Sequence, residues 1–168
     1  FVSRLLATGT IAVFMALVDK LLGTIMKTIA LSDSNKFSTT SFIEMLYPKQ
    51  AEELNGFLFA VLTVVILAFM YLATISVGYF IATLFYRLNK TGKVIMAVSL
   101  PASVVILLPI VDEVFADGKI TKWILDFANF AFGITKNQPI NAVLSFTVIF
   151  AVFSSLSWLL LRKAVVKD

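Results

Sequence analysis

The sequence predicts an all-α integral membrane protein: a bundle of four transmembrane helices with a short interfacial or re-entrant amphipathic helix before the last span. Hydrophobic residues make up 60% of the chain and charged residues only 14%, and the mean hydropathy is +0.96. Charged residues make up about a quarter of soluble domains. The apolar residues also gather in four long runs: 5–30, 57–86, 94–111 and 140–161. At about 1.5 Å per residue, such runs cross or nearly cross a hydrocarbon core of about 30 Å.

Missing residue types exclude several function classes. The chain has no Cys and no His, so it has no disulfides, His-ligated haem, thiol nucleophile or Ser-His-Asp triad, and no zinc site built on these residues. The net charge of +4 bears on membrane orientation, and we expect no nucleic-acid partner. The chain starts at Phe1 without a recognisable signal peptide, and we expect it to be a fragment of a longer protein.

The first run, 5–30, contains the charged residues Asp19, Lys20 and Lys27. A charge inside a membrane span usually marks a polar pathway or a buried partner, which makes Asp19 and Lys20 candidate intramembrane polar residues. The other interpretation is a short span with both residues at its outer end. Both interpretations stay open on the sequence alone.

Residues 31–55 are rich in polar and charged side chains and predict an exposed external loop. An apolar island within it, residues 42–47, is expected to lie on the membrane surface. Two features are possible starts for the next helix: the acidic pair Glu52 and Glu53, and the dipeptide Asn55-Gly56.

The second run, 57–86, has 30 uncharged residues, or about 45 Å of helix, so it must tilt, kink or project. The third run, 94–111, contains Pro101 and Pro109, each of which removes a backbone donor. The two prolines are a candidate hinge or broken helix beside a pathway. A static kink is the simpler interpretation, because membrane helices often contain proline.

Residues 123–134 include nine apolar residues out of twelve and predict a helix too short to span the membrane. Polar residues recur near it at steps of three and four, which places them on one helix face. These are Lys122, Asp126, Asn129, Gly133 and Lys136. The last run, 140–161, has 22 uncharged residues and is long enough to span.

The positions of the cations predict the orientation. Seven cations face one acid on one side of the membrane: Arg4, Arg87, Lys90, Lys93, Arg162, Lys163 and Lys167. The other side has five cations and eight acids. The positive-inside rule makes the first side cytoplasmic, with both termini of this chain on it.

Four features follow one another along the whole chain. They are Val2-Ser3-Arg4, the stretch Phe85-Tyr86-Arg87-Leu88-Asn89-Lys90-Thr91-Gly92-Lys93, the third run with its prolines, and Ser157-Trp158-Leu159-Leu160-Leu161-Arg162-Lys163. In this order they resemble the permease subunits of type-2 ABC exporters from Gram-positive bacteria. Such permeases usually have six spans, of which this chain would supply the last four.

The resemblance implies that residues 88–93 lie in a cytoplasmic coupling region, where a permease meets its ATPase. The candidate coupling residues are Arg87, Leu88, Asn89, Lys90 and Lys93. It also implies two ATPase subunits and a second permease, identical or different, as partners in a bacterial cell membrane. Fixing the topology and touching anionic lipid is the alternative role for these cations.

We therefore expect an exporter permease that forms part of the substrate path and performs no bond-making chemistry. No Walker motif is present, so ATP hydrolysis is expected on a partner subunit, and no cofactor is expected in this chain. Lipids, drugs and amphipathic peptides all fit an apolar path as cargo. The alternative is a non-transporting membrane sensor or scaffold that acts through the external loop and the amphipathic helix.

Overall fold

The structure, a computed structural model, describes residues 2–32, 41–134 and 138–164, and every regular element among them is helical. In chain order these elements are α1 (Val2–Ser32), α2 (Phe42–Leu46), α3 (Pro48–Glu53), α4 (Gly56–Arg87), α5 (Lys90–Ala102), the π-helix η1 (Ser103–Leu107), α6 (Leu108–Phe115), α7 (Lys119–Phe132) and α8 (Pro139–Ala164). Four stretches are long and apolar enough to cross a membrane: Ser3–Ile29, Gly56–Arg87, Lys90–Val114 and Pro139–Arg162. The protein is therefore an all-α membrane protein, as the apolar runs predict.

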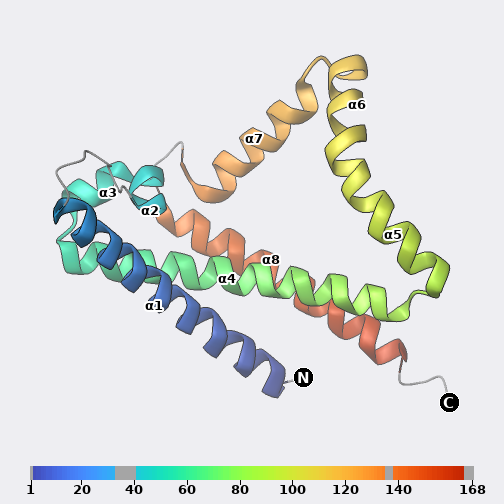
Figure 1. Cartoon of the computed structure of the whole chain (residues 1–168), viewed down its shortest axis with the longest axis horizontal. Coiled ribbons are helices and arrows are strands. Elements are labelled where there is room, and N and C mark those ends of the chain that lie inside the picture. The colour runs from blue at the N-terminus through green and yellow to red at the C-terminus, as the bar shows by residue number, and fades with distance from the viewer. Residues whose placement is uncertain (1, 33–40, 135–137, 165–168) are drawn as a thin grey trace.

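Helix α4 is the centre of the fold, and α1 and α8 pack along it. Figure 1 shows that α8 runs in the same direction as α4 and that α1 runs the opposite way. The start of α1, the end of α8 and the α4–α5 connection consequently point toward one end of the molecule. We call this the basic end, because Arg4, Arg87 and Arg162 belong to it.

Small residues fill the contacts between the three packed helices. The smallest buried side chains are Ala12 and Ala16 on α1, Ala73 and Ser76 on α4, and Ala142 and Ser157 on α8. Many large apolar side chains point outward, and Phe14 is 65% exposed, whereas α4 buries Phe59, Ile66 and Leu67. Membrane helices associate by close backbone approach at small residues, because lipid is as apolar as their side chains. This distribution of side chains is that of helices surrounded by lipid.

The third span, α5–η1–α6, stands away from the packed helices and crosses the upper right of Figure 1. Its regular hydrogen bonding is interrupted between the two prolines, where the Leu108 N–H donates to the Ser103 carbonyl across a π-turn. The π-turn includes Val105, whose carbonyl the Pro109 ring would crowd in a regular α-helix. The π segment therefore precedes Pro109, whereas Pro101 lies within the helix α5.

Asp112 fixes the turn from α6 into α7. Its carboxylate accepts the backbone N–H groups of Ile120 at 2.7 Å and Thr121 at 2.9 Å. Its backbone carbonyl accepts the Gly118 N–H at 3.0 Å. A negative charge beside the free N–H groups of a helix start is stabilising. The amphipathic helix predicted over 123–134 thus begins earlier, at Lys119, and ends at Phe132.

The prediction of an exposed loop over 31–55 is wrong for its described part, where α2 and α3 form. Ile43 and Tyr47 are almost fully buried in the same core as residues of α1, α4 and α8. The Tyr47 hydroxyl donates to the Phe132 carbonyl in the last turn of α7. A helix end leaves such carbonyls without a partner, and a buried tyrosine needs an acceptor. The hydrogen bond from Tyr47 to Phe132 thus holds the apolar island, residues 42–47, against the core.

Of the two possible starts for the second span, Asn55-Gly56 is correct. Helix α4 begins at Gly56 after an Asn55 cap, whereas Glu52 and Glu53 end the short helix α3. The pair therefore lies at a helix C-terminus, where the helix dipole does not favour acids. Both side chains are exposed, so water screens that repulsion.

Gly133 allows the chain to leave α7 and turn back into α8. Its φ of 63° is left-handed, and the Gly133 and Ile134 N–H groups bond to the carbonyls of Phe130 and Asn129, each at 3.0 Å. This is the Schellman pattern, which favours glycine. A Cβ on Gly133 would also lie 2.3 Å from the Gln138 carbonyl oxygen.

Replacing Gly133 by alanine should therefore destabilise the α7–α8 connection. The left-handed conformation alone costs an alanine about 1–2 kcal/mol, and the contact with Gln138 adds to it. Thermal unfolding in detergent measures the loss. The matched control is Gly78→Ala in the interior of α4, where a Cβ meets nothing within 4 Å and alanine is the better helix former. Equal melting temperatures for the two variants would contradict this account.

Candidate functional site

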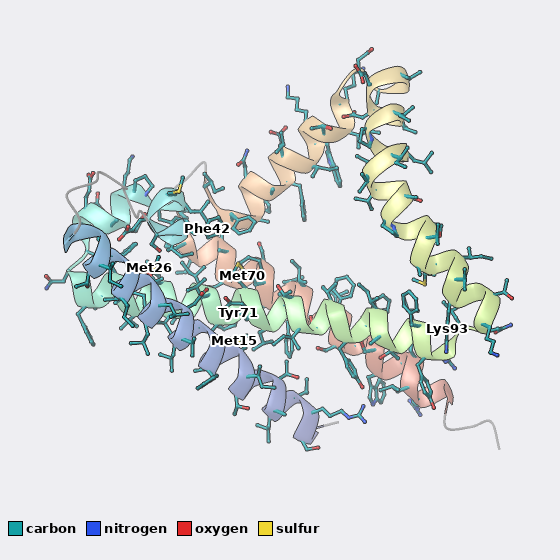
Figure 2. The ribbon with its side chains drawn as sticks, in the orientation of Figure 1. Met15, Met26, Phe42, Met70, Tyr71 and Lys93 are labelled. Carbon is teal, nitrogen blue, oxygen red and sulfur yellow. The ribbon has the colours of Figure 1, made fainter. Side chains whose placement is uncertain are left out.

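A cleft of about 450 Å³ opens between α1, α2 and the first half of α4. Its volume lies within the range of small-molecule sites. We call it the charged cleft, because its lining includes Asp19, Lys20, Lys27 and Glu44. The apolar part of the lining is made by Leu22, Met26, Phe42, Ile43 and Leu67. Figure 2 shows Met26 and Phe42 at the end of the molecule far from Lys93 and the basic end.

Asp19 lies within a membrane-spanning helix and faces α4. Its carboxylate accepts a hydrogen bond of 2.6 Å from the Tyr71 hydroxyl. Tyr71 is in the middle of α4, which runs from Gly56 to Arg87, and Figure 2 shows it halfway along that helix. Helix α1 continues unbroken beyond Asp19 to Ser32. The hydrogen bond thus joins the interior of α1 to the middle of α4.

Lys20 diverges from Asp19 and reaches the other way along α4. Its ammonium lies 5.8 Å from the ring centroid of Phe59, close to the start of α4. The long aliphatic stem of a lysine allows the charge to move toward the membrane boundary in this way, and the ring face attracts the cation. Among the described residues, the only ion pair is Lys27–Glu44, so Lys20 has no carboxylate within ion-pair distance there.

Glu44 closes the side of the charged cleft formed by α2. Its carboxylate lies 3.3 Å from the Lys27 ammonium and accepts the Ser41 backbone N–H at 2.9 Å. Burial alone would raise the pKa of Glu44, but the Ser41 N–H and the Lys27 charge outweigh burial and lower it. The carboxylate is therefore ionised at neutral pH, and both of its partners come from outside its own helix.

Lys27, Glu44 and Tyr71 were not predicted as site residues. In the sequence, Lys27 is one more charge of the first run, and Glu44 lies within the expected external loop. Tyr71 is one of several aromatic residues of the second run, and no local pattern distinguishes it. None of these pairings is local, because Tyr71 is 52 residues from Asp19 and Glu44 is 17 residues from Lys27.

The candidate coupling residues form a separate, exposed surface at the basic end. Helix α4 ends at Arg87 and α5 begins at Lys90, so only Leu88 and Asn89 connect them. The side chains of Arg87, Lys90 and Lys93 are exposed. Lys90 and Lys93 lie in the first turn of α5, where the helix dipole disfavours cations. Helix stability therefore does not explain these two lysines.

The remaining candidates are also outside the charged cleft. Pro101 lies in α5 and Pro109 in α6, and both are exposed. The structure thus brings Asp19 and Lys20 into one cleft but leaves the prolines and the basic connection elsewhere. Within the described residues, no group of three or more acidic side chains is arranged to hold a metal ion.

Comparisons with protein families, with characterised proteins and with solved structures give no match for this chain. The likeness to exporter permeases therefore rests on the sequence features named above.

The Lys27–Glu44 pair predicts a pH-dependent stability. The folded protein lowers the pKa of Glu44. The ionised carboxylate therefore stabilises the folded state fully at pH values above its usual pKa of 4.5. This stabilisation is lost as the pH falls through the lower pKa that Glu44 has in the folded state. The melting temperature of the wild type minus that of Glu44→Gln should be positive and constant from pH 7 to about 5, and should shrink below pH 4. A pair this exposed contributes at most about 1 kcal/mol.

Thermal unfolding in detergent at each pH measures this difference. Glu52→Gln is the matched control, because Glu52 is an exposed carboxylate outside the charged cleft. A Glu44→Gln difference that persists unchanged at pH 3 would show that the ion pair is not its source.

Proposed function

We propose that this chain is part of the permease subunit of an ATP-driven exporter. The observation that carries the proposal is the charged cleft, which opens on membrane helices and contains both an acid and a base from the interior of α1. Charged groups in a span are costly and usually serve a path for polar or charged cargo. In this proposal the charged cleft is part of the substrate path, and ATP is hydrolysed by a partner subunit.

The third span supplies a movable element in this proposal. It stands apart from α4, so side-chain packing does not hold it there, and the π segment weakens its regular hydrogen bonding. Pro101 and Pro109 are its candidate hinge. Rearrangement of such broken helices is one way in which transporters expose a site alternately to each side.

The basic connection is the proposed contact with the ATPase. Its cations are exposed, and two of them oppose the dipole of α5. An acidic surface on an ATPase subunit would cover the exposed cations and offset their unfavourable interaction with the α5 dipole. By the positive-inside rule the basic end lies in the cytoplasm, where ATP is hydrolysed. The resemblance to exporter permeases implies that the membrane is a bacterial cell membrane. A second permease subunit, identical or different, would complete the path.

The alternative is a non-transporting sensor or scaffold that uses residues 31–55 and α7 as contact surfaces. Burial of Ile43 and Tyr47 removes two of the apolar side chains that such a surface would use. Trp123, Phe127 and Phe130 on α7 remain exposed, and a membrane interface accounts for them equally well.

Mass spectrometry of the protein purified in mild detergent separates the two functions. The exporter proposal expects an ATPase subunit in stoichiometric amount, with hydrolysis that changes when the permease is removed. Recovery of the intact protein without an ATPase, from cells that contain it at normal levels, would favour the sensor or scaffold.

Replacing Arg87, Lys90 and Lys93 together by alanine should weaken the ATPase contact. Three exposed charge contacts of about 0.5 kcal/mol each correspond to roughly a tenfold loss of copurified ATPase. The basal hydrolysis rate of the remaining complex should also change. The control is the double variant Lys119→Ala and Lys122→Ala, which removes exposed cations of α7. Unchanged copurification and hydrolysis in the triple variant would contradict the coupling role and leave topology as the role of these residues.

A further inference from the structure

Lys20 is the charged residue of the charged cleft that has no hydrogen-bond partner among the described residues. Asp19 accepts a hydrogen bond from the neutral Tyr71 hydroxyl, and Lys27 and Glu44 pair with each other. The Lys20 ammonium lies over the Phe59 ring face, and its charge acts on Glu44 from beyond ion-pair distance. A cation in a weakly polar environment is stabilised strongly by an anion and only modestly by a ring.

The Lys20 ammonium lies beside the start of α4, away from the middle of that helix. The 32 residues of α4 make about 48 Å of helix, whereas the hydrocarbon core is about 30 Å thick, so α4 must tilt or project. A lysine in a span extends its charge toward a membrane boundary. The direction in which Lys20 extends, toward the start of α4, agrees with this tendency.

The lining of the charged cleft also contains apolar side chains. Leu22 and Met26 on α1 and Phe42 on α2 contribute to it, and Met26 and Phe42 lie close together in Figure 2. An anionic head with an apolar tail would place its charge at Lys20 and its tail along these side chains. Both carboxylates of the cleft already accept hydrogen bonds, whereas the Lys20 ammonium has no hydrogen-bond acceptor among the described residues.

We propose that the charged cleft binds an amphiphile whose headgroup carries a phosphate, with the Lys20 ammonium as the phosphate ligand. Phosphate is the anionic group that every glycerophospholipid carries in its headgroup, and lysine binds it as a point charge. That the bound amphiphile is cargo rests on the proposed exporter function, whereas its binding does not.

Native mass spectrometry of the protein released from detergent tests the proposal with three probes. Phosphatidic acid carries the phosphate and the tails, diacylglycerol the same tails alone, and glycerol 3-phosphate the head alone. Phosphatidic acid should be retained at least about tenfold better than either of the others, because both the charge and the tails contribute.

Two variants should move the affinity in opposite directions. Lys20→Gln should lower the retention of phosphatidic acid about tenfold, and Lys20→Arg, which keeps the charge, should stay within about threefold. Glu44→Gln removes a negative charge and frees the Lys27 ammonium, so retention should rise about threefold. Misfolding cannot produce such a gain. Lys122→Gln on α7, outside the charged cleft, should change nothing.

Retention of phosphatidic acid by Lys20→Gln at the wild-type level would overturn the proposal. Equal retention of diacylglycerol would overturn it too, since ordinary lipid contact needs no phosphate site. Retention of glycerol 3-phosphate alone would exclude an amphiphile. If the phosphatidic acid results hold while no ATPase copurifies, the exporter function fails and the binding site stands. If an ATPase copurifies but Lys20→Gln binds normally, only the binding site fails.

Discussion

The absence of water in the hydrocarbon core is the constraint on which the rest of this structure depends. Every backbone polar group in a span must find its partner within the protein, which favours continuous helices. The same constraint acts on hydroxyl side chains. Thr8 on α1, Thr63 on α4, Ser103 in η1 and Thr147 on α8 each donate to a backbone carbonyl four residues earlier. Their hydroxyls are satisfied locally, so polar recognition is left mainly to the charged residues.

Tyrosines make three of the polar contacts between elements. Tyr79 accepts a hydrogen bond from Arg4 near the start of α1, Tyr71 donates to Asp19, and Tyr47 donates to the last turn of α7. A tyrosine suits this role because its ring packs like an apolar side chain while its hydroxyl reaches one polar group. Together these three contacts tie α1 and α7 to the rest of the fold without requiring a charge on the central helix.

Local patterns predicted the local part of this structure. The lengths of the apolar runs predicted four candidate spans whose bounds differ from those observed by at most four residues. The helical spacing of polar residues predicted α7. The charged cleft was only half predicted, through Asp19 and Lys20, because its other charges come from pairings between distant segments. The acidic pair Asp112 and Glu113 shows the same limit: the two residues are adjacent and alike in charge, yet Asp112 is buried and accepts N–H groups of α7 while Glu113 is exposed.

The third span connects the two surfaces to which the proposed function assigns roles. It starts at the basic connection and ends at Phe115, and Asp112 in its last turn holds the first turn of α7. The last turn of α7 is held in turn by Tyr47, next to the helix that carries Glu44. The span is thus anchored through α7 at one end and little packed along its length. A force on the basic connection would meet its least resistance at the π segment and its greatest at α7. The π segment is therefore the place where this fold would bend.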